Sequence, residues 1–184
     1  MQKGVIGISD PNLGSAAVQT LVRDIGAKWV RAEFRWDYIA PEEHTFYVTT
    51  EDKMVKSFYE KGVAMPAQIG YPPPAITDCQ VLGARYYEFL SNLVSWYKPS
   101  GGFSKQQGMG TYGISYWEIF NEPNSPGFGW FAGRGNSRYK GEELLNAYVY
   151  MLVVSNITIR SLDPNAIIIM GGLSPDGYPA FDFL

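Results

Sequence analysis

The chain has 184 residues and a formal net charge of -3, from 15 Lys and Arg against 18 Asp and Glu. This length can bury one substantial core, so residues 1–184 are expected to form a single domain. The apolar stretches fall far short of the roughly 20 residues that a membrane-spanning helix needs, which excludes a transmembrane protein. A sequence pI near 5.2 without a basic run argues against nucleic-acid binding, because little is available to neutralise phosphates.

Cysteine and histidine are scarce. The only cysteine is Cys79 and the only histidine is His44, which excludes an internal disulfide and a zinc site built from clusters of these residues. No cofactor or metal is therefore expected. The N-terminus lacks the pattern of a secretory signal, so the compartment stays open, with the cytoplasm as the default expectation. Aromatic residues make up 15% of the chain, which suits a neutral ligand such as a sugar.

The hydrophobic pattern alternates short extended runs with amphipathic stretches of helical period. Strands are expected at residues 4–9, 28–36, 63–70, 114–120 and 166–170. Helices are expected to end near Gly26, to run from about 49 to 62 and from about 84 to 98, and to cover about 144–162. The strand at 166–170 is continuously apolar, which is typical of a strand buried on both faces.

Strict alternation of strands and helices implies a parallel sheet with helices packed on it. One solution is an open doubly wound sheet, which would carry a glycine-rich phosphate loop after its first strand. The only match to that motif, Gly108–Gly113, precedes a strand and opens no helix. The sequence therefore favours the other solution, a (β/α)8 TIM-barrel-type α/β fold that is incomplete, with about five βα units.

Polar residues gather where the fourth expected strand ends, in the nonapeptide Tyr116-Trp-Glu-Ile-Phe-Asn-Glu-Pro-Asn124. The apolar strand runs directly into Asn121 and Glu122, and Pro123 ends it. A carboxylic acid at the lip of such a strand is partly desolvated, which favours its protonated form. A general acid for a sugar leaving group requires that property.

This nonapeptide resembles the fourth-strand signature of the clan A glycoside hydrolases, retaining (β/α)8 enzymes that include family 5 cellulase-like and family 39 xylosidase-like members. The resemblance implies that Glu122 is the acid/base and that Asn121 hydrogen-bonds the 2-hydroxyl of the sugar. Residues 29–41 are similar to the second-strand segment of the same family, in which an arginine is followed by an acidic residue, a tryptophan and a proline-ended turn. That match implies that Arg31 supports the catalytic carboxylates and so assists substrate binding.

Alternation along the second strand places Arg31, Glu33 and Arg35 on one face, the expected barrel interior. An Arg–Glu–Arg network with a purely structural role is the alternative to a role in the site. Glu118 shares a strand face with Glu122, and extended geometry separates the two by ~13 Å, too far for a catalytic carboxylate pair. Glu118 is therefore expected to be a buried, hydrogen-bonded barrel residue.

Three aromatic residues follow expected strands at the same end of the sheet: Trp36, Tyr71 and Trp130. Flat rings stack on the C–H faces of pyranoses, so each is a candidate substrate-binding residue. The alternative is that each ring packs beneath a neighbouring loop, which is the commoner position of large aromatic side chains.

A retaining glycosidase needs a second carboxylate, which in this family is a glutamate at the end of strand seven, and no residue here matches that motif. The chain is also about 65 residues shorter than a typical barrel of ~250. We therefore expect the N-terminal part of a catalytic barrel that hydrolyses a β-linked oligo- or polysaccharide, with the acid/base present and the nucleophile missing. Its partners would be a carbohydrate substrate and either the C-terminal part of the barrel or a second copy of the chain. The alternatives are a non-catalytic or vestigial carbohydrate-binding barrel and, with less support, a metal-dependent barrel hydrolase.

Overall fold

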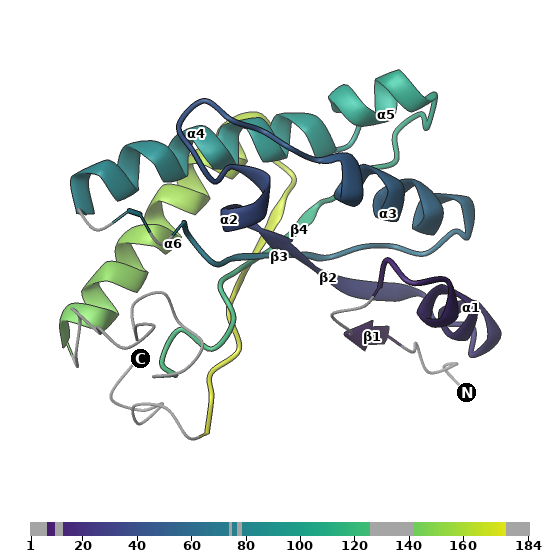
Figure 1. The fold of residues 1–184 in the computed structure, drawn as a ribbon, viewed down its shortest axis with the longest axis horizontal. Helices are drawn as coiled ribbons and strands as arrows, with labels where there is room; N and C mark the ends of the chain where they lie inside the picture. Colours follow the sequence, from purple (N-terminus) through teal and green to yellow (C-terminus); the bar gives the residue numbers. More distant parts are fainter. Residues whose placement is uncertain (1–6, 10–12, 74, 77–78, 126–141, 176–184) are drawn as a thin grey trace.

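The computed structural model describes residues 7–9, 13–73, 75–76, 79–125 and 142–175. Strands and helices alternate along this part of the chain (Figure 1). The strands are β1 Gly7–Ser9, β2 Trp29–Arg35, β3 Ala67–Gly70, β4 Tyr116–Ile119 and β5 Ile167–Met170. The helices are α1 Ala16–Asp24, α2 Trp36–Ile39, α3 Thr49–Glu60, α4 Cys79–Tyr97, α5 Gly102–Gln107 and α6 Glu142–Leu162.

The five strands form one parallel sheet in the order β1-β2-β3-β4-β5, which is also their order in the chain. A doubly wound sheet would reverse its order beside the first strand, and this sheet does not. The main helices follow one another around one side of the row of strands (Figure 1). The predicted barrel-type α/β fold, rather than the open doubly wound one, is therefore confirmed.

Strand β2 shows how the sheet divides its two faces. Val30, Ala32 and Phe34 are fully buried, whereas the alternate residues between them are half-buried. The buried set packs beneath the helices and the half-buried set faces the opposite side, which we call the inner face. Arg31 and Glu33 lie in the half-buried set together with Arg35, as predicted.

Aromatic side chains form much of the core between the sheet and helices α4 and α6. The ring of Trp36 stacks on Phe89 at 5.2 Å between centroids and also contacts Tyr86. Tyr86 in turn stacks on Phe120, which meets Tyr148 of α6 edge to face. This continuous aromatic cluster lies beneath the carboxyl ends of the central strands, because Trp36 and Phe120 directly follow β2 and β4.

Several local predictions differ from the structure. Helices α2 and α5 were not expected, because elements of 4 and 6 residues are too short to show a helical period. In α3 the carboxylate of Asp52 accepts hydrogen bonds from Trp96 Nε1 and the Tyr97 hydroxyl. In α4, Tyr86 is buried whereas its neighbour Tyr87 is 56% exposed.

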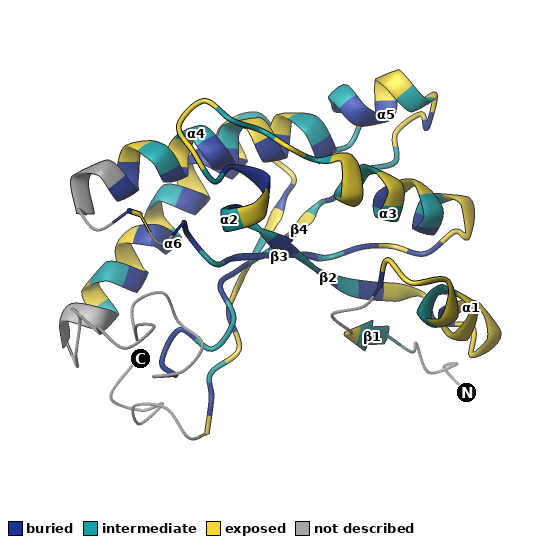
Figure 2. Ribbon diagram, viewed as in Figure 1, coloured by how far each residue is buried: buried dark blue, intermediate teal, exposed yellow. Residues whose placement is uncertain are grey.

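The expectation that β5 is buried on both faces was also wrong. Ile167 and Ile169, on its inner face, are 47% and 38% exposed. Strand β5 ends the row of strands, and the inner face of the described sheet is not covered by a helix. Figure 2 shows exposed residues along α6 as well as buried ones. Four apolar residues of α6 are 45% to 64% exposed: Val149, Tyr150, Val153 and Ile157.

A search of the described helices for a segment long and apolar enough to cross a bilayer finds none.

The exposed apolar surface predicts that the chain self-associates at high concentration. Replacing Val153 with Glu and Ile157 with Lys should shift the chain toward monomer, because charged side chains oppose burial of the exposed apolar residues of α6. Analytical ultracentrifugation over a concentration series measures the shift. Asn156→Glu, at an exposed polar position of the same helix, serves as the control and should leave association unchanged. A parent chain that stays monomeric at every concentration would contradict the prediction.

Candidate functional site

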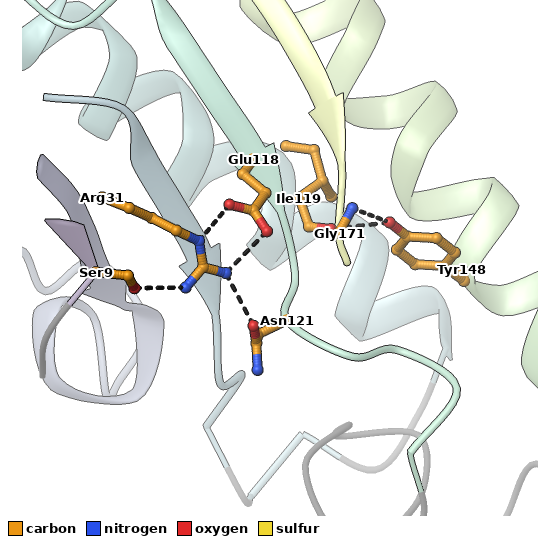
Figure 3. A network of polar contacts seen from close by, with 7 residues as sticks. All are labelled: Ser9, Arg31, Glu118, Ile119, Asn121, Tyr148 and Gly171. Atoms are coloured by element: carbon orange, nitrogen blue, oxygen red, sulfur yellow. Dashed lines mark hydrogen bonds and ion pairs between the residues drawn. The ribbon is translucent and has the colours of Figure 1, made fainter. Parts of the chain in front are cut away.

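An ion pair crosses the inner face of the sheet from β2 to β4. Arg31 Nε donates to Glu118 Oε2 at 2.5 Å, and Arg31 Nη2 donates to Glu118 Oε1 at 2.8 Å (Figure 3). The side chains of the two residues are 20% and 12% exposed. Strand β3 lies between β2 and β4, so the bridge passes over it. The hydrogen bond expected of Glu118 is confirmed, although the residue is half-buried rather than buried.

Neighbouring carboxylates also stabilise the positive charge of the Arg31 guanidinium. Its hydrogen bond with Glu118 raises its pKa above the ordinary value, partial burial opposes this, and the charges of Glu118 and Glu33 add to the rise. The cation is therefore permanent at any physiological pH. Its remaining nitrogen, Nη1, lies 3.5 Å from the Ser9 hydroxyl of β1. Arg31 thus connects three strands of the sheet.

Left-handed backbone marks the end of β4. Phe120 has φ of 63° and Glu122 has φ of 46°, a region that bulky residues rarely occupy. The turn at Phe120 interrupts the alternation of side chains between the two faces of the sheet. The side chains of the consecutive residues Ile119 and Phe120 are therefore both buried. Asn121 consequently reaches the inner face, where it meets Arg31. Because the backbone is not extended here, the ~13 Å separation of the carboxylates expected from ideal strand geometry does not apply.

Arg31 fixes the orientation of the Asn121 amide. Arg31 Nη2 donates to Asn121 Oδ1 at 2.8 Å. Since a guanidinium has no acceptor, the amide must present its oxygen to Arg31. Its NH₂ group therefore points away from Arg31 (Figure 3). Asn121 offers a hydrogen-bond donor, rather than an acceptor, to anything that binds beside it.

Glu122 follows directly and is half-buried. Its backbone N–H donates to the carbonyl of Gly172 at 2.9 Å, beyond the end of β5. The loop that follows is anchored by buried Asn124, whose amide bonds both the N–H and the carbonyl of Ser174. Strand β5 and the residues after it therefore hold the Glu122 turn in place.

Tyr71, the residue after β3, has φ of 59° and is half-buried. The guanidinium of Arg35 lies 4.5 Å from its ring centroid and 4.0 Å from that of Tyr38. Asp37 pairs with the same guanidinium at 2.7 Å. Partial burial raises the pKa of the Tyr71 phenol, and the negative charge of Glu33 adds to the rise. Tyr71 is therefore a neutral ring at the same end of the sheet as Asn121.

Of the other two predicted aromatic residues, Trp36 is not brought to this group. Trp36 begins α2 and is 1% exposed, with its ring stacked on Phe89. The faces of its ring are covered by protein, so Trp36 follows the alternative given for these residues, a packed ring rather than a substrate-binding one. Trp130 lies outside the described residues.

The alternative considered for β2, an Arg–Glu–Arg network, is not formed by direct ion pairs. Arg31 pairs with Glu118 and Arg35 with Asp37, whereas Glu33 acts on Arg31 through its charge. His44 is exposed, with its ring 2.9 Å from Glu88. Across the described ranges, no group of His, Cys, Asp and Glu could hold a metal ion.

Gln68 is a polar residue of this region that sequence reasoning missed. It lies between Glu33 and Glu118 in the register of the sheet and is fully buried. Its amide lies over Gly70, where a Cβ would approach Gln68 Nε2 to 2.6 Å. Neither of its side-chain polar atoms has a hydrogen-bond partner in the described part of the chain. The sequence alone does not identify Gln68 as a residue of the site. Its position between Glu33 and Glu118 is apparent only once the register of the three strands is known.

No protein-family model matches the chain, and no curated protein matches it. Solved structures do. The chain is similar to a family 39 glycoside hydrolase from the gut symbiont Bacteroides cellulosilyticus WH2, with 15% identity and a TM-score of 0.55, over 92% of this chain and 33% of that one. It is similar to an exo-β-1,4-mannosidase from Opitutaceae bacterium strain TAV5, with 15% identity and a TM-score of 0.61, over 91% and 31%. It is also similar to Cel5A of Thermotoga maritima, solved with cellobiose, with 17% identity and a TM-score of 0.62, over 92% and 48%.

The chain spans about a third to a half of the length of these three enzymes. At identities of 15% to 17%, the likenesses concern the fold. The chain has the architecture of part of a glycoside hydrolase barrel, and the predicted resemblance is confirmed at that level.

Removing one partner of the Arg31–Glu118 bridge should destabilise the protein. Arg31→Met leaves a buried carboxylate without its cation and should lower the free energy of unfolding by about 2 kcal/mol, less than a fully buried pair because both groups are partly exposed. Adding Glu118→Gln should restore part of the loss. Urea unfolding of the two single variants and the double variant measures the coupling. Strictly additive losses would contradict a direct bridge.

Gln68→Met should stabilise the protein by about 1 kcal/mol, because a buried amide without a partner is replaced by an apolar side chain of similar shape. Ser155→Ala is the matched control, since that buried hydroxyl is bonded to Tyr86 and to the Met151 carbonyl, and it should destabilise instead. Thermal unfolding compares the two. A loss of stability in Gln68→Met would show that the amide has a partner in solution.

Proposed function

We propose that residues 1–184 are the N-terminal part of the catalytic barrel of a retaining glycosidase that acts on a β-linked oligo- or polysaccharide, and that they carry its acid/base. The observation that carries the proposal is the turn at the end of β4. There Asn121 and Glu122 follow one another, Phe120 and Glu122 are left-handed, and the Asn121 amide is oriented by Arg31. Strained backbone of this kind is characteristic of functional sites. The barrel architecture shared with glycoside hydrolases supports the same reading.

In the proposed reaction Glu122 acts twice. Its carboxylic acid first donates a proton to the glycosidic oxygen while a second carboxylate attacks the anomeric carbon, so the C–O bond breaks and a glycosyl ester forms. The resulting Glu122 carboxylate then takes a proton from water, whose oxygen attacks the anomeric carbon and releases the second carboxylate. The configuration at the anomeric carbon is retained after two displacements.

The residues around Glu122 suit a neutral sugar. The NH₂ of Asn121 would donate to a sugar hydroxyl oxygen, the 2-hydroxyl in the resemblance. Arg31 would assist binding through Asn121 rather than by direct contact, because Glu118 and Asn121 use its nitrogens. The ring of Tyr71, and that of Trp130, would stack on pyranose rings. Trp36 is not included, because it is buried in the core.

The second carboxylate is proposed to come from outside residues 1–184. Of the acidic residues on the described inner face, Glu118 is committed to Arg31 and Glu33 acts on the same cation. The chain spans 33% of the family 39 enzyme and 48% of Cel5A, so more than half of each of those chains has no counterpart here. A partner that continues the sheet beyond β5 would both supply the carboxylate and cover the exposed face of that strand.

Glu122→Gln should lower hydrolysis roughly 10²–10⁴-fold when the leaving group is a sugar, because general acid assistance is lost. The first step on a 4-nitrophenyl β-glycoside should change much less, since that leaving group departs without a proton. The measurement is the rate on cellobiose and on 4-nitrophenyl β-glucoside and β-mannoside, in the natural protein that carries residues 1–184.

Glu88→Gln, at an exposed glutamate that pairs with His44, is the control and should retain full activity. Equal rates for Glu122→Gln and the parent protein would overturn the acid/base assignment. Sugar binding without any hydrolysis by the parent protein would instead favour the second candidate, a non-catalytic carbohydrate-binding barrel.

A further inference from the structure

The hydroxyl of Tyr148 lies at the point where β4 and β5 end. Tyr148 belongs to α6 and is 1% exposed. Its hydroxyl donates to the carbonyl of Ile119 at 2.9 Å and accepts from the N–H of Gly171 at 2.8 Å (Figure 3). Ile119 is the last residue of β4, and Gly171 directly follows β5. A helix side chain is thereby inserted between the backbones of two neighbouring strands.

This junction lies immediately before the Glu122 turn. The Gly171 N–H also donates to the Ile119 carbonyl at 3.1 Å, and the next bond between the segments joins the Glu122 N–H to the Gly172 carbonyl at 2.9 Å. The Tyr148 hydroxyl is therefore next to the backbone hydrogen bond that joins Glu122 to Gly172. The same short run of backbone bonds therefore connects the end of β5 to the Glu122 turn.

The backbones of the two segments are closely packed where β4 and β5 end. A Cβ added at Gly171 would lie 2.4 Å from the Phe120 carbonyl oxygen, so the two backbones are already in close contact. The ring of Tyr148 meets that of Phe120 edge to face at 6.1 Å. Phe120 is one of the two left-handed residues of the turn. Tyr148 thus contacts the turn through its ring and the strand ends through its hydroxyl.

We propose that Tyr148 is a positioning residue for Glu122, whose hydroxyl fixes the ends of β4 and β5 and so sets the backbone conformation from which the Glu122 carboxyl is presented. This inference rests on the proposed role of Glu122. Tyr148 acts through the backbone and is not itself assigned a contact with substrate.

Tyr86 offers a matched comparison within the same protein. It is also fully buried, and its ring also packs on Phe120, at 6.2 Å. Its hydroxyl, however, bonds the Ser155 hydroxyl at 2.9 Å, between helices α4 and α6. Removing either hydroxyl leaves the ring packing intact, but only Tyr148→Phe removes bonds to the strand ends.

The test compares Tyr148→Phe with Tyr86→Phe in the 184-residue chain by amide hydrogen exchange, read residue by residue by NMR. Exchange of the Glu122 and Gly171 amides should be about five- to tenfold faster in Tyr148→Phe, as expected for the loss of a local hydrogen bond, and unchanged within twofold in Tyr86→Phe. The rates are compared after correction for each variant's global stability. Equal acceleration in both variants, or none in either, would overturn the proposal.

A second pair of variants keeps the test open if Tyr148→Phe fails to fold. Gly171→Ala adds a Cβ against the Phe120 carbonyl and should shift the turn, whereas Gly172→Ala adds one that meets nothing within 4 Å. The Glu122 amide should therefore exchange faster in Gly171→Ala than in Gly172→Ala. Identical exchange in these two variants would also count against the proposal.

Activity separates this inference from the function on which it rests. In the natural protein, Tyr148→Phe should lower kcat on cellobiose about tenfold and leave KM within twofold, because the sugar contacts of Asn121 remain, while Tyr86→Phe should alter neither. If the parent protein hydrolyses no glycoside but Tyr148→Phe still accelerates exchange at Glu122, the proposed function fails and the dependence of Glu122 on Tyr148 stands. If the parent is active and kcat is the same in both tyrosine variants, the positioning role fails.

Discussion

The ion pair of Arg31 and Glu118 joins strands that are not neighbours, and the rest of the candidate site depends on it. To span β3, the guanidinium must lie along the inner face, where the same nitrogen that bonds Glu118 also bonds Asn121. The bridge lies above β3, which carries the buried amide of Gln68. Desolvation offsets much of the Coulombic attraction in such a pair, so its main effect is to define one arrangement of the inner face rather than to add stability.

Around the bridge, the ends of the strands hold conformations that isolated peptides avoid. Tyr71, Phe120 and Glu122 all have left-handed φ, and such residues cost of order 1–3 kcal/mol each. Packing on the opposite face offsets the cost, because Phe120 is buried between Tyr86 and Tyr148. The apolar cluster beneath the sheet therefore maintains the polar arrangement above it. The two faces of the sheet cannot be treated as independent.

Much of the fold follows from local patterns in the sequence. Periodicity predicts the main helices and the five strands, and alternation along β2 predicts the face shared by Arg31, Glu33 and Arg35. The partners of those residues could not be predicted, because Arg31 finds Glu118 only through the order of the strands. The position of Asn121 could not be predicted either, since alternation fails at the left-handed Phe120. The exposure of the inner face of β5 could not be predicted either. It depends on which elements lie beside and above that strand, and an apolar run in the sequence does not contain this information.

The contacts of Arg31 also bear on the order in which the molecule can assemble. The hydrogen bonds from Arg31 to Glu118 and Asn121 join residues 87 and 90 positions apart in the chain. A backbone hydrogen bond within an α-helix joins residues only four positions apart. Contacts this distant in the chain require most of the intervening loops to be closed first, which places them late in folding. Helices and local βα units can therefore form while the inner face is still unorganised. The paired guanidinium is then a marker of completed folding, and a protein with native helix content need not yet have a site.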